Sequence, residues 1–410
     1  MENSASGQIQ QEANSSIKNE NAEIPEKSRT SSGNENQIEQ LVIDFATMLK
    51  TSDILVLDEC RIYKVPYHLR KWNEESYSPR VISIGPYHHN KENFQTMEKH
   101  KVRYFKSFMQ RAENEINLEN LVTTITEMED IIRHCYVHTV QLERDDFVKT
   151  IMLDATFILE FFLKAELEEW TEDNPMLVEA WLYPMMSHEL LLLENQLPFF
   201  VIKKIDHLAL PSRSNSLSLI QLTFEYFGYL NIHNKAPEGE IKHFTDLLRF
   251  FALPPHDKLP QRNPKAVFPK YSATQLREAG VKFEVVPNIC VLDLSFKERV
   301  LKIPLLKFED YMEAFVRNIM ALEQCDDKKD RYITDFYILL DYLIDTNKDV
   351  DLLAEKGIIN NGLGDRWKAI LRNQYFSTPW RAASTIAAII LLVLTLIQTV
   401  CSIIQIVPIV

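Results

Sequence analysis

Ionisable side chains that could carry out acid–base chemistry are scattered along the 410 residues of this chain. Asp154 lies between two apolar sectors of a helical pattern, and Glu194 lies in the run HELLLLENQLPFF, which begins at His188. Two carboxylates and one of the eleven histidines would suffice for a hydrolase or transferase site built from distant segments. The other interpretation is that Asp154 is a buried, hydrogen-bonded structural anchor. We favour this anchor because nothing in the sequence pairs the carboxylate with a second group.

Metal and cofactor chemistry has weaker support in the sequence. The spacings that suggest metal binding are those of His88-His89 with His100, and of His134 with His138. Neither group has a neighbouring cysteine or carboxylate in a recognised ligand pattern, so surface or capping roles are the better interpretation. None of the nine glycines belongs to a GxGxxG, GxxxxGKS/T or GxSxG motif, and HExxH is also absent. We therefore predict no catalytic residue, no metal and no cofactor, and we do not expect an enzyme.

The composition excludes further classes of function. The five cysteines are odd in number and widely spaced, which argues against a disulfide framework and fits a reducing compartment. Cys60 stands beside Arg61, which could lower the pKa of the thiol, but a lone buried thiol is the default interpretation. The formal net charge of −13 would repel a phosphate backbone, so we predict no nucleic-acid partner.

The elements that would position these residues are mainly helical. In residues 97–111 the apolar side chains follow one helical face, and in residues 148–163 they cover so broad a face that this helix should be central. The run Leu190 to Leu193 is predicted to be helical until Pro198, which disfavours a helical Leu197 and can start a new helix. The amides of the intervening Asn195 and Gln196 are expected to satisfy backbone groups at this break.

Extended structure is predicted in short segments only, and the last two of them could pair as a β-hairpin. These segments are residues 80–84 before the Gly85-Pro86 turn, 282–286, 290–296 and 300–303. Residues 212–218 and 254–269 are predicted to be loops, and the second loop is a possible subdomain boundary. The fold class expected for residues 37–376 is therefore a large, mainly α soluble domain with a few short strands.

The two ends of the chain differ from this domain. Residues 1–36 are polar, lack the pattern of a signal peptide, and should form a disordered tail. Residues 382–407 contain no charged side chain and are long enough to cross a ~30 Å hydrocarbon core as one transmembrane helix. A C-terminal core helix is the less favoured interpretation. Because Lys368, Arg372 and Arg381 precede the span, we predict a tail-anchored, single-pass protein with its N-terminal domain in the cytosol, at the plasma membrane or an endomembrane.

One side of the predicted span carries small and amide side chains, which permit close approach and hydrogen bonding between membrane helices. This candidate association face consists of Ser384, Ala387, Ala388, Thr395, Gln398, Thr399, Ser402 and Gln405. It would serve self-association into a homo-oligomer or contact with a partner's membrane helix. The alternative is that these residues only moderate the hydrophobicity of the anchor for membrane sorting.

Several segments in a fixed order resemble a plant family, the domain of unknown function 247, also called uncharacterised protein family 0481. The most specific segments are CRIYKVPYHLR, YSPRVISIGPYHH, MEKHKVRYF, DFVKTIMLDATFILEFF, LLLLENQLPFFVI, LREAGVKFE, LDLSF, LKIPLL, RNIMALEQC and DVDLLAEKGII. The resemblance covers nearly the whole chain outside the N-terminal tail. It implies a largely helical domain with a C-terminal membrane helix, and it brings no established catalytic residues.

The chain departs from the family pattern near Gly362. Relatives usually carry a further helical stretch here, whereas residues 360–365 connect directly to Arg366. The two interpretations are a shortened variant and an error in the predicted coding sequence. If such helices pack on the domain in relatives, this chain should expose an apolar patch where they dock.

Two functions from different classes follow from these observations. The first is a membrane-anchored recognition or signalling component that binds another protein, as the association of some grass relatives with pollen–stigma self-incompatibility implies. The alternative is a membrane-tethered hydrolase or transferase that uses Asp154, Glu194 and a histidine. A deep polar pocket that gathers these groups would favour the enzyme, and a flat apolar or charged surface would favour binding.

Overall fold

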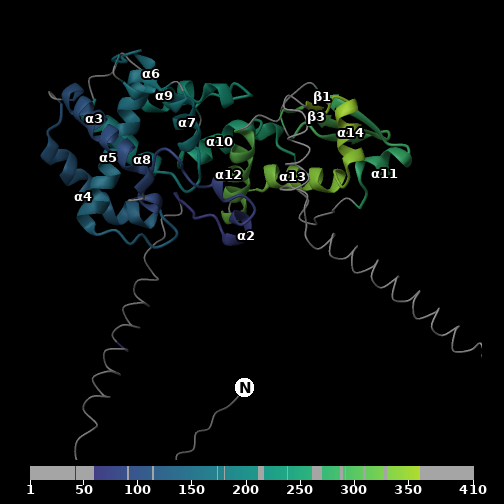
Figure 1. Ribbon diagram of the computed structural model, residues 1–410, viewed down its shortest axis with the longest axis horizontal. Helices are drawn as coiled ribbons and strands as arrows, with labels where there is room; N and C mark the ends of the chain where they lie inside the picture. The colour runs from purple at the N-terminus through teal and green to yellow at the C-terminus, as the bar shows by residue number, and fades with distance from the viewer. Residues whose placement is uncertain are drawn as a thin grey trace, which may run out of the picture. The chain divides into compact units, whose positions relative to one another are not determined.

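The computed structural model describes Val42 and residues 60–360, apart from residues 90–91, 113–114, 173, 180, 211–216, 238, 261–269, 287–289, 291, 308–310 and 327–329. The chain divides into two compact units, residues 1–55 and residues 56–410, and every element named below belongs to the second. The described part is mainly helical with small sheets, as predicted (Figure 1). It contains no helix with both the length and the apolar character to cross a membrane.

The tail at residues 1–36, the predicted span at 382–407 and its association face lie outside the described residues, as does the segment around Gly362. The elements of the described part follow in chain order. The longer helices are α3 (Gln95–Arg111), α4 (Leu118–His134), α5 (Arg144–Glu166), α7 (Leu182–Glu189), α8 (Phe199–Ala209), α9 (Leu219–Tyr226), α10 (Phe244–Ala252), α12 (Met312–Cys325), α13 (Tyr332–Leu343) and α14 (Asn347–Glu355). Shorter helices are α2 (Tyr67–Arg70), α6 (Pro175–Val178) and α11 (Ala273–Glu278), with 3₁₀ turns η1 (Glu74–Ser76), η2 (Pro86–His88), η3 (Glu92–Phe94), η4 (Gly228–Leu230) and η5 (His256–Lys258).

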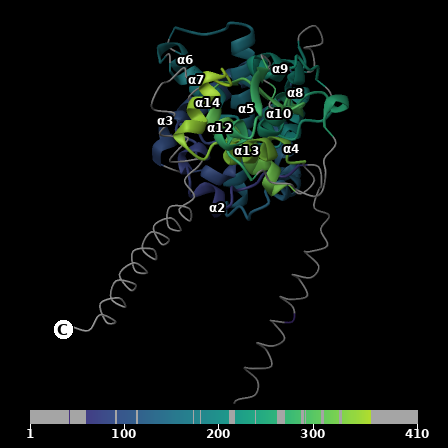
Figure 2. The same ribbon diagram turned by 90° about the vertical axis from the view of Figure 1, so that its right-hand side faces the viewer.

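Helix α5 is the central element of the larger hydrophobic cluster, which we call the main core. Most of its side chains from Phe147 to Leu163 are buried, and α3, α4, α8 and α9 pack around it (Figures 1 and 2). A helix that is apolar around most of its circumference must be covered on several sides, so the predicted central position is confirmed. On α3 the buried residues are Met97, Lys101, Tyr104 and Phe108, which confirms the predicted face.

One part of the main core is a cluster of aromatic rings. Phe161 lies in contact with Trp170, Tyr183 and Tyr226, and Phe162 packs on Tyr226 with ring centroids 4.6 Å apart. Edge-to-face and offset-stacked pairs of this kind add to the free energy gained by burying the apolar area. They attach α7 and α9 to the C-terminal half of α5.

A second hydrophobic cluster, the sheet core, surrounds a small three-stranded sheet. Strands β1 (Lys282–Val286), β3 (Val300–Pro304) and β2 (Ser295–Lys297) lie in that order, with β2 antiparallel and β1 parallel to β3. The predicted hairpin between the last two strands is confirmed. The two residues of its turn, Glu298 and Arg299, have positive φ values of 51° and 64°. Buried residues of the sheet, α11, α13 and α14 form the cluster; they include Phe283, Leu301, Ile303, Leu340 and Leu353.

Two sequence predictions about extended segments need correction, and one small sheet was not predicted. The predicted strand 290–296 begins only at Ser295, because a turn with Asp293 N bonded to Cys290 O precedes it. A two-stranded parallel sheet of β4 (Leu306–Lys307) and β5 (Ile359–Asn360) was not predicted. Residues 80–84 do not form a strand, because their N–H groups bind side chains rather than a neighbouring strand.

The third correction concerns the leucine run. Helix α7 ends at Glu189, and Leu190 is its C-cap, so residues 191–193 continue as turns instead of a helix. The carbonyl groups of Leu190 and Leu192 accept hydrogen bonds from the side-chain amide of Gln196, which replace helical bonds. Pro198 caps the N-terminus of α8, as predicted. The predicted loop 254–269 contains η5, and its residues 261–269 lie outside the described residues. Most of the predicted loop 212–218 also lies outside them.

Candidate functional site

The most polar part of the interior is a group of buried carboxylates that come from the family-like segments. Asp154 is 1% exposed and accepts a hydrogen bond from Gly85 N at 2.7 Å, while its other oxygen lies 2.5 Å from Lys101 Nζ. Burial raises the pKa of Asp154 to about 6 although Lys101 acts to lower it. Burial disfavours the charged ammonium of Lys101, but Asp154 and Glu98 outweigh burial and raise its pKa. Asp154 is the buried, hydrogen-bonded anchor that the sequence predicted.

Gly85 joins this pair to the next segment of the chain. Its φ of +73° and ψ of −177° lie in a region that is open to glycine almost alone. A Cβ at this position would stand 2.4 Å from Gln196 O and 3.0 Å from the hydroxyl of Tyr136. Both the backbone conformation and the close packing against Gln196 therefore require glycine at this position.

Glu189 holds the segment that was predicted to be a strand. Its carboxylate accepts hydrogen bonds from the consecutive N–H groups of Arg80, Val81 and Ile82 at 2.6–2.9 Å. Burial raises the pKa of Glu189, and the three N–H groups oppose this effect. One side chain therefore replaces a neighbouring strand as the hydrogen-bond partner.

Glu194 lies next to a histidine, His88, as the enzyme hypothesis required of a carboxylate in the site. Its carboxylate lies 3.1 Å from His88 Nε2, forms an ion pair with Arg70, and accepts a hydrogen bond from Val65 N at 2.6 Å. Burial favours the neutral acid, but His88 and Arg70 outweigh burial and lower the pKa of Glu194. Both oxygens of the ionised carboxylate are bonded to protein groups, so Glu194 has a structural role.

Asn195 and Gln196 satisfy backbone groups, as the sequence predicted, but some of their partners come from distant segments. Asn195 accepts from Ile84 N at 2.7 Å, and its amide nitrogen donates to the carbonyls of Ile82 and Glu189. Gln196 accepts from Phe244 N, at the start of α10. The two amides therefore fasten together segments that are remote in the sequence.

The structure does not assemble Asp154, Glu194 and a histidine into one acid–base site. Asp154 pairs with a lysine, Glu194 pairs with His88, and both carboxylates are at most 3% exposed. The histidines singled out for metal binding also have separate surroundings: His134 Nδ1 lies against Asp130 O, and His138 Nδ1 accepts from Lys64 N. Within the described ranges no three His, Cys, Asp or Glu side chains are grouped to hold a metal ion.

Cys60 is buried, and its thiol lies 3.5 Å from Lys242 O. The neighbouring Cys135 and burial raise the pKa of the Cys60 thiol. The cation that acts to lower this pKa is Lys242, not the neighbouring Arg61, and its effect is outweighed, so the thiol is the buried one taken as the default.

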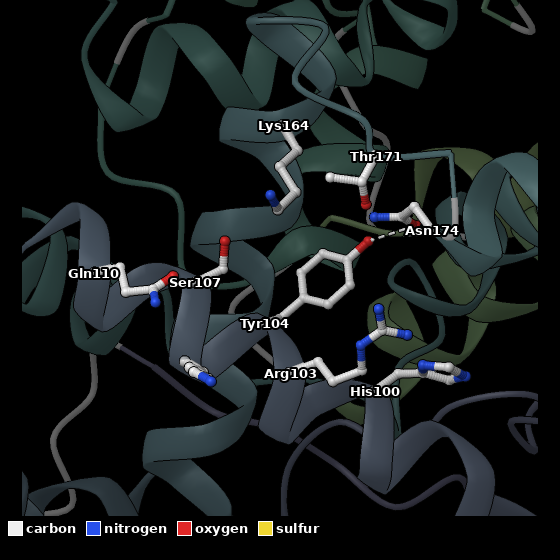
Figure 3. Close-up of a pocket in the computed structure, with 9 residues that line it drawn as sticks. His100, Arg103, Tyr104, Ser107, Gln110, Lys164, Thr171 and Asn174 are labelled. Carbon is white, nitrogen blue, oxygen red and sulfur yellow. Dashed lines mark hydrogen bonds between the residues drawn. The ribbon is translucent and has the colours of Figure 1, made fainter.

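Two open cavities present basic side chains instead. The first has a volume of about 370 Å³ and lies above Tyr104 on α3 (Figure 3). Its lining is His100, Arg103, Tyr104, Lys106, Ser107, Gln110, Lys164, Thr171 and Asn174. The second has a volume of about 480 Å³ and is lined by Arg61, Arg133, His134, Tyr136, Val137, His138, Thr139 and Val140. Neither lining contains an aspartate or a glutamate.

Sequence reasoning missed the first cavity, although a signal was present. Positions 100, 103, 107 and 110 follow the helical repeat, and together they form a polar and basic stripe beside the apolar face of α3. The contributions of Lys164, Thr171 and Asn174 depend on the packing of other segments against α3, which no local pattern reveals.

A pair of exposed aromatic side chains lies at and just after α2. Tyr67 is 80% exposed and Trp72 is 41% exposed, with Lys71 Nζ 4.8 Å from the centre of the Trp72 ring. The backbone beneath them is fixed, because Val65 and Arg70 both bind the buried Glu194. Two large rings are therefore presented to solvent on a rigid support.

The amino-acid sequence of the chain is similar to those of plant proteins. The UPF0481 protein At3g47200 of Arabidopsis thaliana is 26% identical over 414 aligned residues, which cover 83% of this chain and 86% of that protein. The putative UPF0481 protein At3g02645 of Arabidopsis thaliana is 27% identical over 164 residues, 39% of this chain and 29% of that protein. No match is found among solved structures. The family model of domain of unknown function 247, described as a plant protein of unknown function, matches residues 62–368, and this chain belongs to that family.

Proposed function

We propose that this protein is a membrane-anchored recognition component whose helical domain binds another protein through the surface formed by Tyr67 and Trp72. The observation that supports the proposal most strongly is the exposure of these two rings on one short segment, 80% and 41% respectively. Tryptophan, tyrosine and arginine are the side chains most often found at energetic hot spots of protein interfaces. Exposed apolar area on a rigid support is a further common property of such surfaces.

The support lowers the entropic cost of binding. The segment that carries the rings is held from below by Glu194, and Arg70 also donates to Ser78 Oγ at 3.0 Å. A partner that packs on the rings has little backbone to order, so more of the contact free energy contributes to affinity. In this proposal the ion pair between Arg70 and Glu194 positions the binding surface.

The membrane part of the proposal depends on the sequence of residues 382–407 alone. Their uncharged composition and the basic residues before them support a tail anchor with the helical domain in the cytosol. Protease added to sealed microsomes should then digest the helical domain. Full protection of that domain without detergent would instead require a lumenal position.

The association face of the predicted anchor is part of the same proposal. Changing Ala387, Thr395, Gln398 and Ser402 together to leucine should abolish self-association in a membrane two-hybrid assay while insertion is preserved. Matched changes at Ile390 and Ile397, on the other side of the helix, should leave association intact. If only the second set disrupts association, the wrong side was chosen.

The binding surface is tested by proximity labelling with the full-length chain in pollen and vegetative tissue. The variant Tyr67→Ser with Trp72→Ser should lose a specific subset of labelled neighbours and keep its fold, because both side chains are exposed. The matched control is Tyr271→Ser with Phe296→Ser, which removes two other rings that are 59% and 63% exposed. Identical labelling by wild type and the Tyr67/Trp72 variant would contradict the proposal.

A further inference from the structure

The cavity above Tyr104 has a charge opposite to that of the whole protein. Three of its nine lining residues are cations, Arg103, Lys106 and Lys164, and none is acidic, in a chain of net charge −13. His100 is a further basic residue of the lining, and burial lowers its pKa. Figure 3 shows Lys164 and Arg103 approaching the same space from opposite sides, with Tyr104 between them. A cavity wall of one charge sign concentrates the field and attracts ions of the other sign.

A buried carboxylate, Glu160, offsets part of this charge through Lys164. Glu160 lies below the cavity and accepts two hydrogen bonds from Arg111, at 2.9 and 3.1 Å, and one from Ser107 at 2.8 Å. Lys164 Nζ is 3.3 Å from the same carboxylate. Arg111 also pairs with Glu169 at 2.6 Å, so Arg111 and Lys164 together balance these two carboxylates, and the net positive charge of the wall comes from Arg103 and Lys106.

Two polar groups at the cavity are oriented as hydrogen-bonding partners for a ligand. The oxygen of the Asn174 amide accepts from Met176 N at 3.0 Å and from the Tyr104 hydroxyl at 3.2 Å, so the amide nitrogen points the other way, towards Thr171 (Figure 3). His100 Nδ1 is buried and has no hydrogen-bond partner within the described part of the chain. A buried polar atom without a partner is costly, and a ligand that bonds to it would recover this cost.

We propose that the cavity above Tyr104 binds a small phosphate-bearing anion, such as a phosphorylated polyol, either free or as the headgroup of a lipid. Each phosphate presents three terminal oxygens, and arginine, lysine and hydroxyl donors are the groups that bind such oxygens. A single carboxylate would leave most of these donors unused. A volume of about 370 Å³ suits a ligand of this size. The proposal is independent of the protein-binding surface on α2.

The first test is calorimetric titration of the full-length protein in detergent with inositol 1,4,5-trisphosphate. Lys106→Glu should weaken binding at least about tenfold, because Lys106 is an exposed side chain whose replacement brings a negative charge to the cavity wall. The control Lys204→Glu makes the same change of charge on α8, outside the lining, and should alter affinity less than about twofold. His100→Ala should weaken binding at constant thermal stability.

The second test separates the two sources of the anion. The protein is placed in nanodiscs of phosphatidylcholine alone or with phosphatidylinositol 4,5-bisphosphate, and the soluble trisphosphate is titrated into each. The site binds a lipid headgroup if the trisphosphate binds more weakly in nanodiscs that contain the bisphosphate lipid and Lys106→Glu removes this difference. Equal binding in both assigns it to a free anion. No measurable binding, or an equal loss in the Lys106 and Lys204 variants, would overturn the proposal.

Discussion

The main core and the sheet core use buried carboxylates in different ways. In the main core, Asp154, Glu189 and Glu194 each bind groups from segments far away in the sequence. In the sheet core, Asp349 accepts from Thr346 at the start of its own helix and from Ser272 Oγ and Thr274 N at the start of α11. Both sets of contacts join segments far apart in the sequence, but Asp349 serves to cap helix starts, whereas Asp154 and Glu194 also carry buried ion pairs, with Lys101 and Arg70. Single substitutions should therefore be more damaging in the main core.

The largest expected effect is that of Gly85→Ala. The new Cβ would meet Gln196 O at 2.4 Å, and alanine would also have to adopt a positive φ. Strain and overpacking together should lower the free energy of unfolding by about 4 kcal/mol. The measurement is urea unfolding followed by circular dichroism.

The matched control for this substitution is Gly357→Ala, next to the sheet core. Gly357 has a similar φ of +71°, but nothing lies within 4 Å of its added Cβ. Only the conformational cost remains, about 1 kcal/mol. Equal losses at the two glycines would remove the difference that we draw between the regions.

The second prediction concerns the buried pair in the main core. Asp154→Asn keeps an acceptor for Gly85 N but leaves the Lys101 charge with Glu98 alone, so it should cost about 3 kcal/mol. A double-mutant cycle with Lys101→Met should show a coupling free energy, because each substitution removes the same interaction.

Glu284→Gln in the sheet is the control for the pair. Glu284 and Lys302 lie 3.7 Å apart on neighbouring strands, and both side chains are about half exposed. The Glu284→Gln variant should lose less than about 0.5 kcal/mol of unfolding free energy.

A stable Asp154→Asn variant that lost a purified enzymatic activity would instead support the catalytic interpretation of Asp154.

Among the buried carboxylates, the smallest predicted effect is that of Asp349→Asn, which should lower the free energy of unfolding by about 1–2 kcal/mol at pH 6. Burial opposes ionisation of Asp349, but hydrogen bonds from Thr346, Thr274 and Ser272 outweigh it and lower the pKa below its usual 3.8. The stabilising contribution is therefore complete above pH 3.8 and is lost as the pH falls through the lower, folded-state pKa. The difference between wild type and variant should shrink below pH 3.8 in urea titrations. A constant difference across that range would exclude the ionised carboxylate as the cause.

Local patterns were enough to predict α3, α5 and β1, because each is set by its own periodicity. The leucine run was misread because its helical propensity is overridden by the side-chain amide of Gln196, which follows it. The burial of Asp154 could be predicted from its place among apolar residues, whereas its partner Lys101 could not. That pairing depends on how α3 packs against α5, which is a property of the whole fold.

The turn between β2 and β3 has a consequence for the order of folding. Two-residue hairpin turns with positive φ at both positions favour Asn-Gly, whereas here they are Glu298 and Arg299. The left-handed conformation costs each of them about 1–2 kcal/mol, so the hairpin is a poor nucleus by itself. We expect it to close late, after α11, α13 and α14 offer the apolar surface on which Leu301 and Ile303 pack.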